Sequence, residues 1–299
     1  MAQLIKLQDY ISRYQNDIFR YPSQFIRLKK ENYKGVLNQW EQDKDQLTLE
    51  AERDDWFEED KESKLKRFFQ RKKPPEEEEV VTEPIPNSEL ELKQAFLNQI
   101  FDFQLKWASS TLQEVSFLDQ YYSTNATLKY FLTRFPDTFL VMYEPLFKIQ
   151  KALIEVEVVI VTPTSVLCIS ILPEEEVTYD SLDQRKWVKN KNQQKTNIVN
   201  PNISLNRMAN TVESILNQQE VDFPVHRILL ARDAFIKAQT SSKHTTYVDR
   251  SNYEYWFEKQ RKEQTPLKHQ QLKAAGALLE YTQVTSIKRP EWESVSDDF

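Results

Sequence analysis

Apolar residues recur at helical spacing in the first part of the chain. The first stripe consists of Leu4, Leu7, Ile11, Tyr14 and Ile18. Steps of three or four residues place these side chains on one face of an α-helix. Pro22 interrupts the stripe, and a second one runs from Ile26 to Trp40. The pattern predicts a helical N-terminal region over residues 1–72, which is either a helical hairpin or an arm that binds a protein partner.

A change in composition separates this region from the next one. Residues 73–87 contain four prolines and a run of glutamates, a composition that does not pack as a helix or strand. We therefore predict a linker. Ser88 and Glu91 then have the spacing of a capping box at a helix start, and apolar residues follow at steps of three or four up to Trp107. This predicts a long amphipathic helix within residues 88–120.

Beyond residue 120, short apolar runs alternate with helical patterns. The predicted strands cover residues 139–143, 152–162, 166–172, 225–231 and 245–248. The predicted helices cover residues 126–135, 203–216, 251–262 and 265–282. This order predicts an α/β (α+β) domain over residues 121–289, in which helices cover a short mixed sheet. Residues 290–299 are expected to form a tail.

The glycine content excludes several classes of enzyme. The chain has two glycines in 299 residues, Gly35 and Gly276. Phosphate-binding loops, dinucleotide fingerprints and nucleophile elbows need glycine for tight turns and close backbone approach. We therefore expect no nucleotide-loop enzyme, no α/β-hydrolase and no small-molecule cofactor.

Cysteine content, charge and hydropathy indicate where the protein is located and what it can bind. Cys168 is the only cysteine, so we expect a buried, inert thiol and no thiolate zinc site. The start of the chain lacks the apolar core of a signal peptide, and no apolar run is long enough for a membrane span. We expect a cytoplasmic protein without membrane contact. The net charge of −6 means that any nucleic-acid contact needs a local basic patch.

A carboxylate interrupts one of the apolar strands. Glu157 lies among valines and isoleucines, directly before a turn-forming Thr162-Pro163 step and the next strand. Alternation along a strand puts Glu155 and Glu157 on one face. One interpretation is a solvent-facing acidic pair on an amphipathic strand. The other is a remnant of a catalytic site.

The order of elements around Glu157 resembles that of a known family. The matching features are Glu157, the turn at Thr162-Pro163, the strand Val166–Ile171, Trp187, Asn200-Pro201 and the strand 225–231. Together they resemble the nuclease-related domain, NERD, of the restriction-endonuclease-like PD-(D/E)xK superfamily. The resemblance covers roughly residues 115–285 and implies a bacterial protein with a restriction-endonuclease-like mixed sheet flanked by helices.

The resemblance also implies a site, which this chain does not complete. Active members hold Mg²⁺ with an acid on the second strand and a Glu-x-Lys motif on the third. Here Glu157 stands at the position of the first acid, Ser170 at that of the glutamate and Leu172 at that of the lysine. Serine is a poor magnesium ligand, and leucine can neither bind metal nor donate to phosphate. We therefore expect a catalytically inactive scaffold with no metal.

An alternative is an Mg²⁺-dependent nuclease whose catalytic residues have moved to neighbouring elements. The acidic candidates for such a site are Glu144, Glu174, Glu175, Glu176 and Asp180.

A basic stretch offers a further candidate site. Its residues are Arg185, Lys186, Trp187, Lys189, Lys191 and Lys195. Such a cluster could bind a nucleic-acid backbone and stack a base on the tryptophan. The other interpretation is a solvated loop with Trp187 packed inward. The expected role is thus nucleic-acid association or scaffolding, with residues 1–72 as the alternative site for a protein partner.

Overall fold

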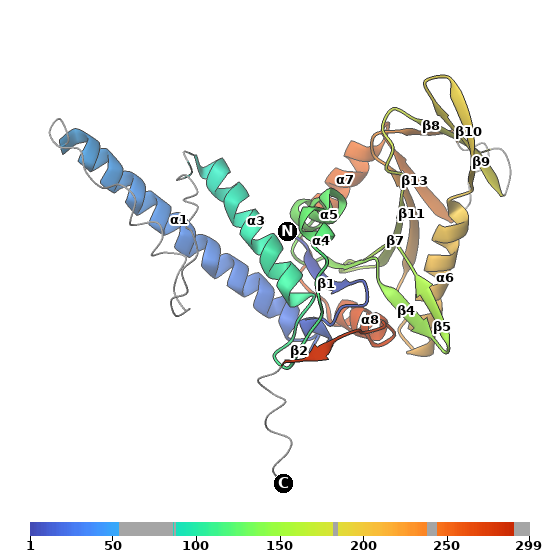
Figure 1. Cartoon of the computed structure of the whole chain (residues 1–299), viewed down its shortest axis with the longest axis horizontal. Coiled ribbons are helices and arrows are strands. Elements are labelled where there is room, and N and C mark those ends of the chain that lie inside the picture. Colours follow the sequence, from blue (N-terminus) through green and yellow to red (C-terminus); the bar gives the residue numbers. More distant parts are fainter. Residues whose placement is uncertain (54–85, 87, 182–184, 238–243, 290–299) are drawn as a thin grey trace, which may run out of the picture. The chain divides into compact units, whose positions relative to one another are not determined.

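The computed structural model describes residues 1–53, 86, 88–181, 185–237 and 244–289. For residues 43–53 this description covers the backbone alone. The predicted linker, except for Pro86, and the predicted tail lie outside the described residues. The chain divides into two compact units, one made of Met1–Arg27 with Gln99–Phe299 and the other of Leu28–Asn98. The fold combines helices with several sheets and is of the α+β kind (Figure 1).

A six-stranded mixed sheet organises the larger unit, in the order β1-β3-β6-β7-β11-β13. Its strands are β1 (Gln3–Leu7), β3 (Leu140–Tyr143), β6 (Val158–Val161), β7 (Val166–Ile171), β11 (Val225–Ala231) and β13 (Thr245–Asp249). Strand β6 is antiparallel to both of its neighbours, β3 and β7, whereas β11 and β13 run parallel to β7. The carboxyl ends of β1, β3, β7, β11 and β13 therefore lie at one edge of the sheet, together with the start of β6.

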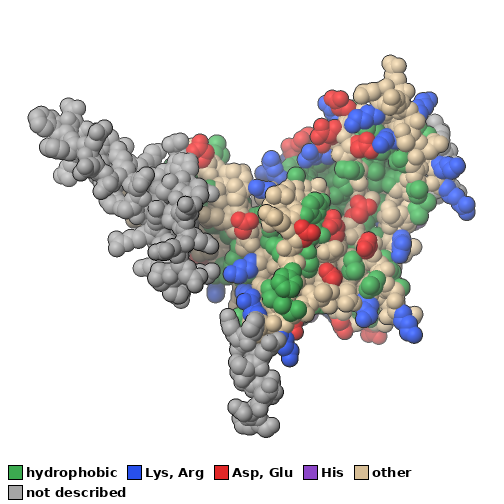
Figure 2. All heavy atoms as spheres, viewed as in Figure 1, with side chains coloured by type: hydrophobic (Ala, Val, Ile, Leu, Met, Phe, Trp, Pro, Cys, Tyr) green, Lys and Arg blue, Asp and Glu red, His purple; other side chains and the backbone are tan. Residues whose placement is uncertain are grey.

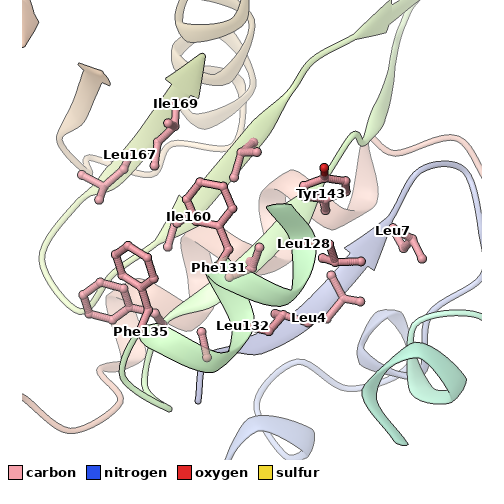
Figure 3. Close-up of a cluster of buried hydrophobic side chains, with 14 of the residues drawn as sticks. Leu4, Leu7, Leu128, Phe131, Leu132, Phe135, Tyr143, Ile160, Leu167 and Ile169 are labelled. Atoms are coloured by element: carbon pink, nitrogen blue, oxygen red, sulfur yellow. The ribbon is translucent and has the colours of Figure 1, made fainter. Parts of the chain in front are cut away.

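Helices cover both faces of this sheet. One face packs against α4 (Tyr121–Thr124), α5 (Ala126–Arg134) and α7 (Tyr253–Arg261) in a continuous apolar core. Figure 3 shows Phe131 of α5 beside Ile160 of β6 in this core, together with Phe135, which directly follows the helix. The opposite face contacts α6 (Asn202–Gln218) and α8 (His269–Glu280). Strands β3, β6 and β7 are buried on both faces, which explains why their sequences are nearly continuous apolar runs.

A second sheet of four strands holds the basic stretch, in the order β10-β9-β8-β12. Its strands are β8 (Thr178–Ser181), β9 (Lys186–Lys191), β10 (Gln194–Val199) and β12 (Phe235–Lys237). Asn192 and Gln193 link β9 to β10 with positive φ angles of 48° and 66°, as two-residue hairpins require. The interpretation of this stretch as a solvated loop is therefore wrong: it forms a hairpin, whose polar residues hide the strand pattern in the sequence.

Two small sheets complete the larger unit. The pair β4 (Leu146–Ile149) and β5 (Ala152–Glu155) forms a hairpin, and β2 (Glu114–Val115) pairs with β14 (Ile287–Lys288). The strand predicted over residues 152–162 is thus wrong in its extent. It divides before Glu157, because β5 pairs with β4 whereas β6 pairs with β3 and β7.

The helix predicted from the first apolar stripe is wrong. Residues Gln3–Leu7 form β1, which pairs in parallel with β3, and the 3-10 helix η1 (Arg13–Gln15) follows. All five residues of β1 are buried, so the apolar positions that suggested a helical face instead fill both faces of a strand. Pairing with a distant strand outweighs the local helical spacing. Met1–Arg27 consequently belongs to the sheet unit, and partner binding by residues 1–72 stays a prediction.

The smaller unit is helical. It contains most of α1 (Tyr21–Arg53) and the start of α3 (Glu89–Trp107). The rings of Tyr33 and Phe96 lie 5.1 Å apart between these two helices. The helix predicted after Ser88 is present but ends at Trp107, short of the predicted residue 120. The Ser88 hydroxyl accepts from the Glu91 N–H at 3.2 Å at its start. No helix in the described part of the chain is long and apolar enough to cross a membrane.

Most predicted elements of the second half are confirmed with small changes. Strands 166–172, 225–231 and 245–248 correspond to β7, β11 and β13, and the helix 203–216 to α6. The last helix begins at His269, a few residues after the predicted Pro266. Cys168 is buried inside β7, as predicted.

Candidate functional site

Glu157 meets Ser170 across the β6–β7 hairpin. Val158 pairs with Ile169 in the antiparallel register, so the residue before β6 lies opposite Ser170. The Ser170 hydroxyl donates to Glu157 Oε1 at 2.6 Å, and the Ile171 N–H donates to Oε2 at 2.8 Å. Ser170 is only 2% exposed. Both oxygens of the carboxylate are therefore engaged by the protein itself.

Burial dominates the electrostatics of this carboxylate. Desolvation raises the pKa of Glu157 above its ordinary value, and the nearby charge of Glu144 adds to the rise. The hydrogen bonds from Ser170 and Ile171 act in the opposite direction, because they favour the charged form. The solvent-facing acidic pair is therefore wrong as an account of Glu157. Glu155 is exposed on β5, whereas Glu157 is half-buried before β6.

A second carboxylate stands beside the first. The Glu144 N–H donates to the Glu157 carbonyl at 2.6 Å, and the Tyr122 hydroxyl donates to Glu144 Oε2 at 2.8 Å. Glu144 has a positive φ of 49°, a conformation that non-glycine residues adopt at a cost. The sharp turn after β3 thus directs Glu144 towards the start of β6. Tyr122 was missed by the sequence analysis, because its contact with Glu144 spans 22 residues.

The other acidic candidates lie elsewhere. Glu174, Glu175 and Glu176 follow β7 in a loop, and Asp180 belongs to β8. Glu174 forms an ion pair with Lys189 at 2.5 Å. Glu144 is the candidate that the structure brings to Glu157. Among the residues that the structure describes, no group of three or more His, Cys, Asp and Glu side chains comes together as a metal site.

Leu172 occupies the place where the resemblance implies a lysine. Its side chain is half-buried, and its N–H donates to the Leu230 carbonyl at 2.8 Å, continuing the pairing of β7 with β11. An aliphatic side chain here can neither position water nor neutralise a phosphate. With Ser170 donating to Glu157, the residues present do not fit an Mg²⁺ site of the kind that the resemblance implies.

The basic residues divide into two groups. Trp187 is 1% exposed, and its ring lies 6.1 Å from that of Tyr247. It therefore packs inward, and Lys189 is held by Glu174. The exposed members of the stretch are Arg185, Lys186, Lys191 and Lys195. Figure 2 shows Lys and Arg side chains along the margin of the unit where Figure 1 places β8, β9 and β10.

Comparison with known proteins relates part of the chain to a phosphodiesterase. A Geobacillus stearothermophilus protein called RNA 2',3'-cyclic phosphodiesterase is 36% identical over 113 residues. The match covers 35% of this chain and 36% of that relative, so the chain spans little more than a third of the relative's length. No protein-family model matches the chain, and no solved structure matches it.

Proposed function

We propose that the larger unit is a NERD-like, restriction-endonuclease-like domain that binds nucleic acid without cleaving it. The observation that carries this proposal is the hydrogen bond from Ser170 to Glu157 at 2.6 Å. A neutral donor stands where a magnesium site would need a second carboxylate, and it occupies an oxygen that the metal would need.

The order of elements supports the fold part of the proposal. Helix α5 precedes the antiparallel strands β3, β6 and β7, and α6 then leads to β11, which is parallel to β7. This is the order that the resemblance to the PD-(D/E)xK superfamily implies. Glu157 and Ser170 meet in the hairpin where that superfamily carries its acids.

The exposed cations of the second sheet support nucleic-acid association. Lys191 and Lys195 lie at facing ends of β9 and β10, next to the hairpin turn, and both are exposed. Trp187 anchors the same hairpin against Tyr247 of β13. The β9–β10 hairpin that carries these lysines thus packs against the six-stranded sheet. Lysines in such positions contact phosphates and carry no information about base sequence.

The test combines binding with cleavage. Fluorescence anisotropy would follow single-stranded and duplex DNA and RNA over a salt series, and gels would follow the same substrates with Mg²⁺, Mn²⁺ or EDTA. We expect binding that weakens with salt and no cleavage that depends on Glu157. Metal-dependent cleavage by the wild type that disappears in Glu157→Gln would contradict the proposal.

A second candidate function is phosphodiester hydrolysis at a relocated site. Two observations favour it: Glu144 lies beside Glu157, and the Geobacillus relative is named for hydrolysis of cyclic phosphodiesters in RNA. Release of a phosphate monoester from 2',3'-cyclic nucleotides would be measured for the wild type, Glu144→Gln and Glu157→Gln. Activity lost in both variants would favour hydrolysis, and equal rates in all three proteins would exclude this site.

A further inference from the structure

A cleft of about 360 Å³ opens at the edge of the six-stranded sheet where β11 and β13 end. Three arginines line it, and each comes from a different element. Arg134 is the last residue of α5, Arg232 follows β11 and Arg250 follows β13. No local pattern in the sequence connects these residues, because Arg134 lies about a hundred positions before the other two.

The register of the sheet explains why two of the arginines converge. Ala231 pairs with Asp249 in the parallel ladder of β11 and β13, so the residues that follow them are neighbours. Alternation places Arg232 and Arg250 on the side of Leu230 and Val248, which belong to the core beneath α5 and α7. Ser170 pairs with Leu229 and so lies on the other face of the sheet, which packs against α6. The cleft therefore lies on the face opposite to Ser170.

A buried aspartate fixes the turn that carries Arg250. Asp249 accepts hydrogen bonds from the Ile236 N–H at 3.0 Å, the Ser251 N–H at 2.9 Å and the Ser251 hydroxyl at 2.6 Å. In addition, the Asp249 N–H donates to the side-chain oxygen of Asn252 at 2.9 Å. The chain passes directly from this turn into α7, so Arg250 and Tyr253 have a rigid backbone.

Aromatic side chains form the wall of the cleft. The hydroxyls of Tyr130 and Tyr253 are hydrogen-bonded at 2.6 Å, and the Tyr253 ring stacks on Phe257 with centroids 5.5 Å apart. The Arg232 guanidinium lies 5.5 Å from the centroid of Tyr130. These contacts hold the wall in place before any ligand arrives, which lowers the entropic cost of binding.

The cleft is lined by three arginines and two carboxylates, Asp233 and Glu254, so its charged side chains are net positive. Arg232 forms an ion pair with Asp233 at 2.8 Å. Within the described residues, Arg134 and Arg250 form no ion pair, and both are exposed. A guanidinium presents a planar set of donors that matches two oxygens of a phosphate, so two of them facing one cleft favour a doubly charged phosphate group.

We propose that this cleft binds a phosphate monoester, carried by a mononucleotide or by the end of a nucleic-acid strand. Arg134 and Arg250 bind the phosphate, and the wall formed by Tyr130 and Tyr253 contacts the attached nucleoside. The strand end as a source rests on the proposed nucleic-acid binding, whereas the monoester site itself does not. The cleft would give the protein a preference for phosphorylated ends that the lysines of the hairpin do not provide.

Binding of matched ligands to the full chain tests this. Fluorescence anisotropy would compare one oligonucleotide with a 5'-phosphate, a 3'-phosphate or hydroxyls at both ends. Calorimetry would measure AMP, adenosine and inorganic phosphate. We expect one phosphorylated end to bind about tenfold more tightly than the hydroxyl ends, as charge-assisted hydrogen bonds provide. Arg134→Gln and Arg250→Gln should each remove most of that preference. Arg207→Gln, an exposed arginine on α6, should keep it.

The outcomes separate this inference from the proposed function. Binding of AMP but not adenosine, without oligonucleotide binding, would support the cleft with a mononucleotide as its ligand and contradict nucleic-acid association. Oligonucleotide binding that ignores the end groups, with no AMP binding, would overturn the cleft and leave the proposed function standing. An equal loss of preference in Arg207→Gln would also overturn it, because that charge lies outside the cleft.

Discussion

Ser170 and Glu157 are hydrogen-bonded across the β6–β7 hairpin, with 2.6 Å between the serine hydroxyl and Oε1. This hydrogen bond limits which other groups can bind to the Glu157 carboxylate. A buried carboxylate needs donors, and here the protein supplies them from Ser170 and from the Ile171 N–H. The hairpin therefore provides hydrogen-bond donors to both carboxylate oxygens of Glu157.

The first prediction concerns Ser170, whose hydroxyl donates to Glu157. Ser170→Ala removes one of the two donors to a buried carboxylate and should lower the free energy of unfolding by about 1–3 kcal/mol. Urea denaturation would measure the loss. In a double-mutant cycle with Glu157→Ala, the two effects should not add, because both changes remove the same hydrogen bond. Strict additivity would show that the hydrogen bond does not contribute to stability.

The second prediction follows from the raised pKa of Glu157. In the pH range just above its ordinary value of 4.5, this carboxyl holds its proton longer in the folded state than in the unfolded chain. Its contribution to stability therefore falls as the pH rises through that range. Glu157→Gln, whose amide can donate to the Ser170 oxygen, should become more stable relative to wild type as the pH rises above 4.5. Urea denaturation at several pH values would show a flat difference if the pKa were not raised.

The third prediction concerns a buried lysine on β1. Lys6 is fully buried, and its ammonium group donates to the carbonyls of Tyr10 at 2.6 Å and Gln283 at 3.0 Å. Burial lowers the pKa of Lys6 from 10.5 to about 7. The unfolded chain then binds more protons between these values, so stability should rise with pH in this window relative to Lys6→Met. Lys273→Met, an exposed lysine on α8, should show no such dependence in thermal unfolding.

The fourth prediction concerns a buried glutamine of α8. Gln271 is fully buried, and its amide donates to the carbonyls of Thr138 at 2.6 Å and Val161 at 3.0 Å. Gln271→Leu leaves both acceptors unpaired and should cost about 2 kcal/mol of unfolding free energy. Gln270→Leu, at an exposed neighbouring position, should change it by less than about 0.5 kcal/mol. Equal effects in denaturant titrations would show that the two bonds are not needed.

The fifth prediction concerns the lysines of the β9–β10 hairpin. Lys191→Gln and Lys195→Gln should each weaken nucleic-acid binding for all sequences alike, because lysines on phosphates carry no sequence information. The salt dependence of log K should become shallower by about 0.7–0.9 for each phosphate contact removed. Anisotropy titrations at several salt concentrations would measure this, with Lys273→Gln as the control. An unchanged slope in both hairpin variants would place the binding surface elsewhere.

Local patterns determined much of the second half of this chain. The turn after Val161 and the strand to Ile171 could be read from alternation and from Pro163, because a hairpin is made by neighbouring residues. The helix from Asn202 and the strand to Ala231 were visible for the same reason. The family resemblance also assigned Glu157, Ser170 and Leu172 to positions of one site, although it did not show that the serine donates to the glutamate.

Distant pairing decided the rest. Gln3 pairs with Leu140, so a stripe that looked helical became a strand, because a sheet partner that far along the chain leaves no local signal. The same reason applies to the sites. Tyr122 reaches Glu144, and Arg134, Arg232 and Arg250 meet in one cleft, only because the sheet and its covering helices bring the ends of separate elements together. Residue types and spacing determined which chemistry the chain could carry, and the tertiary structure decided which of those groups face one another.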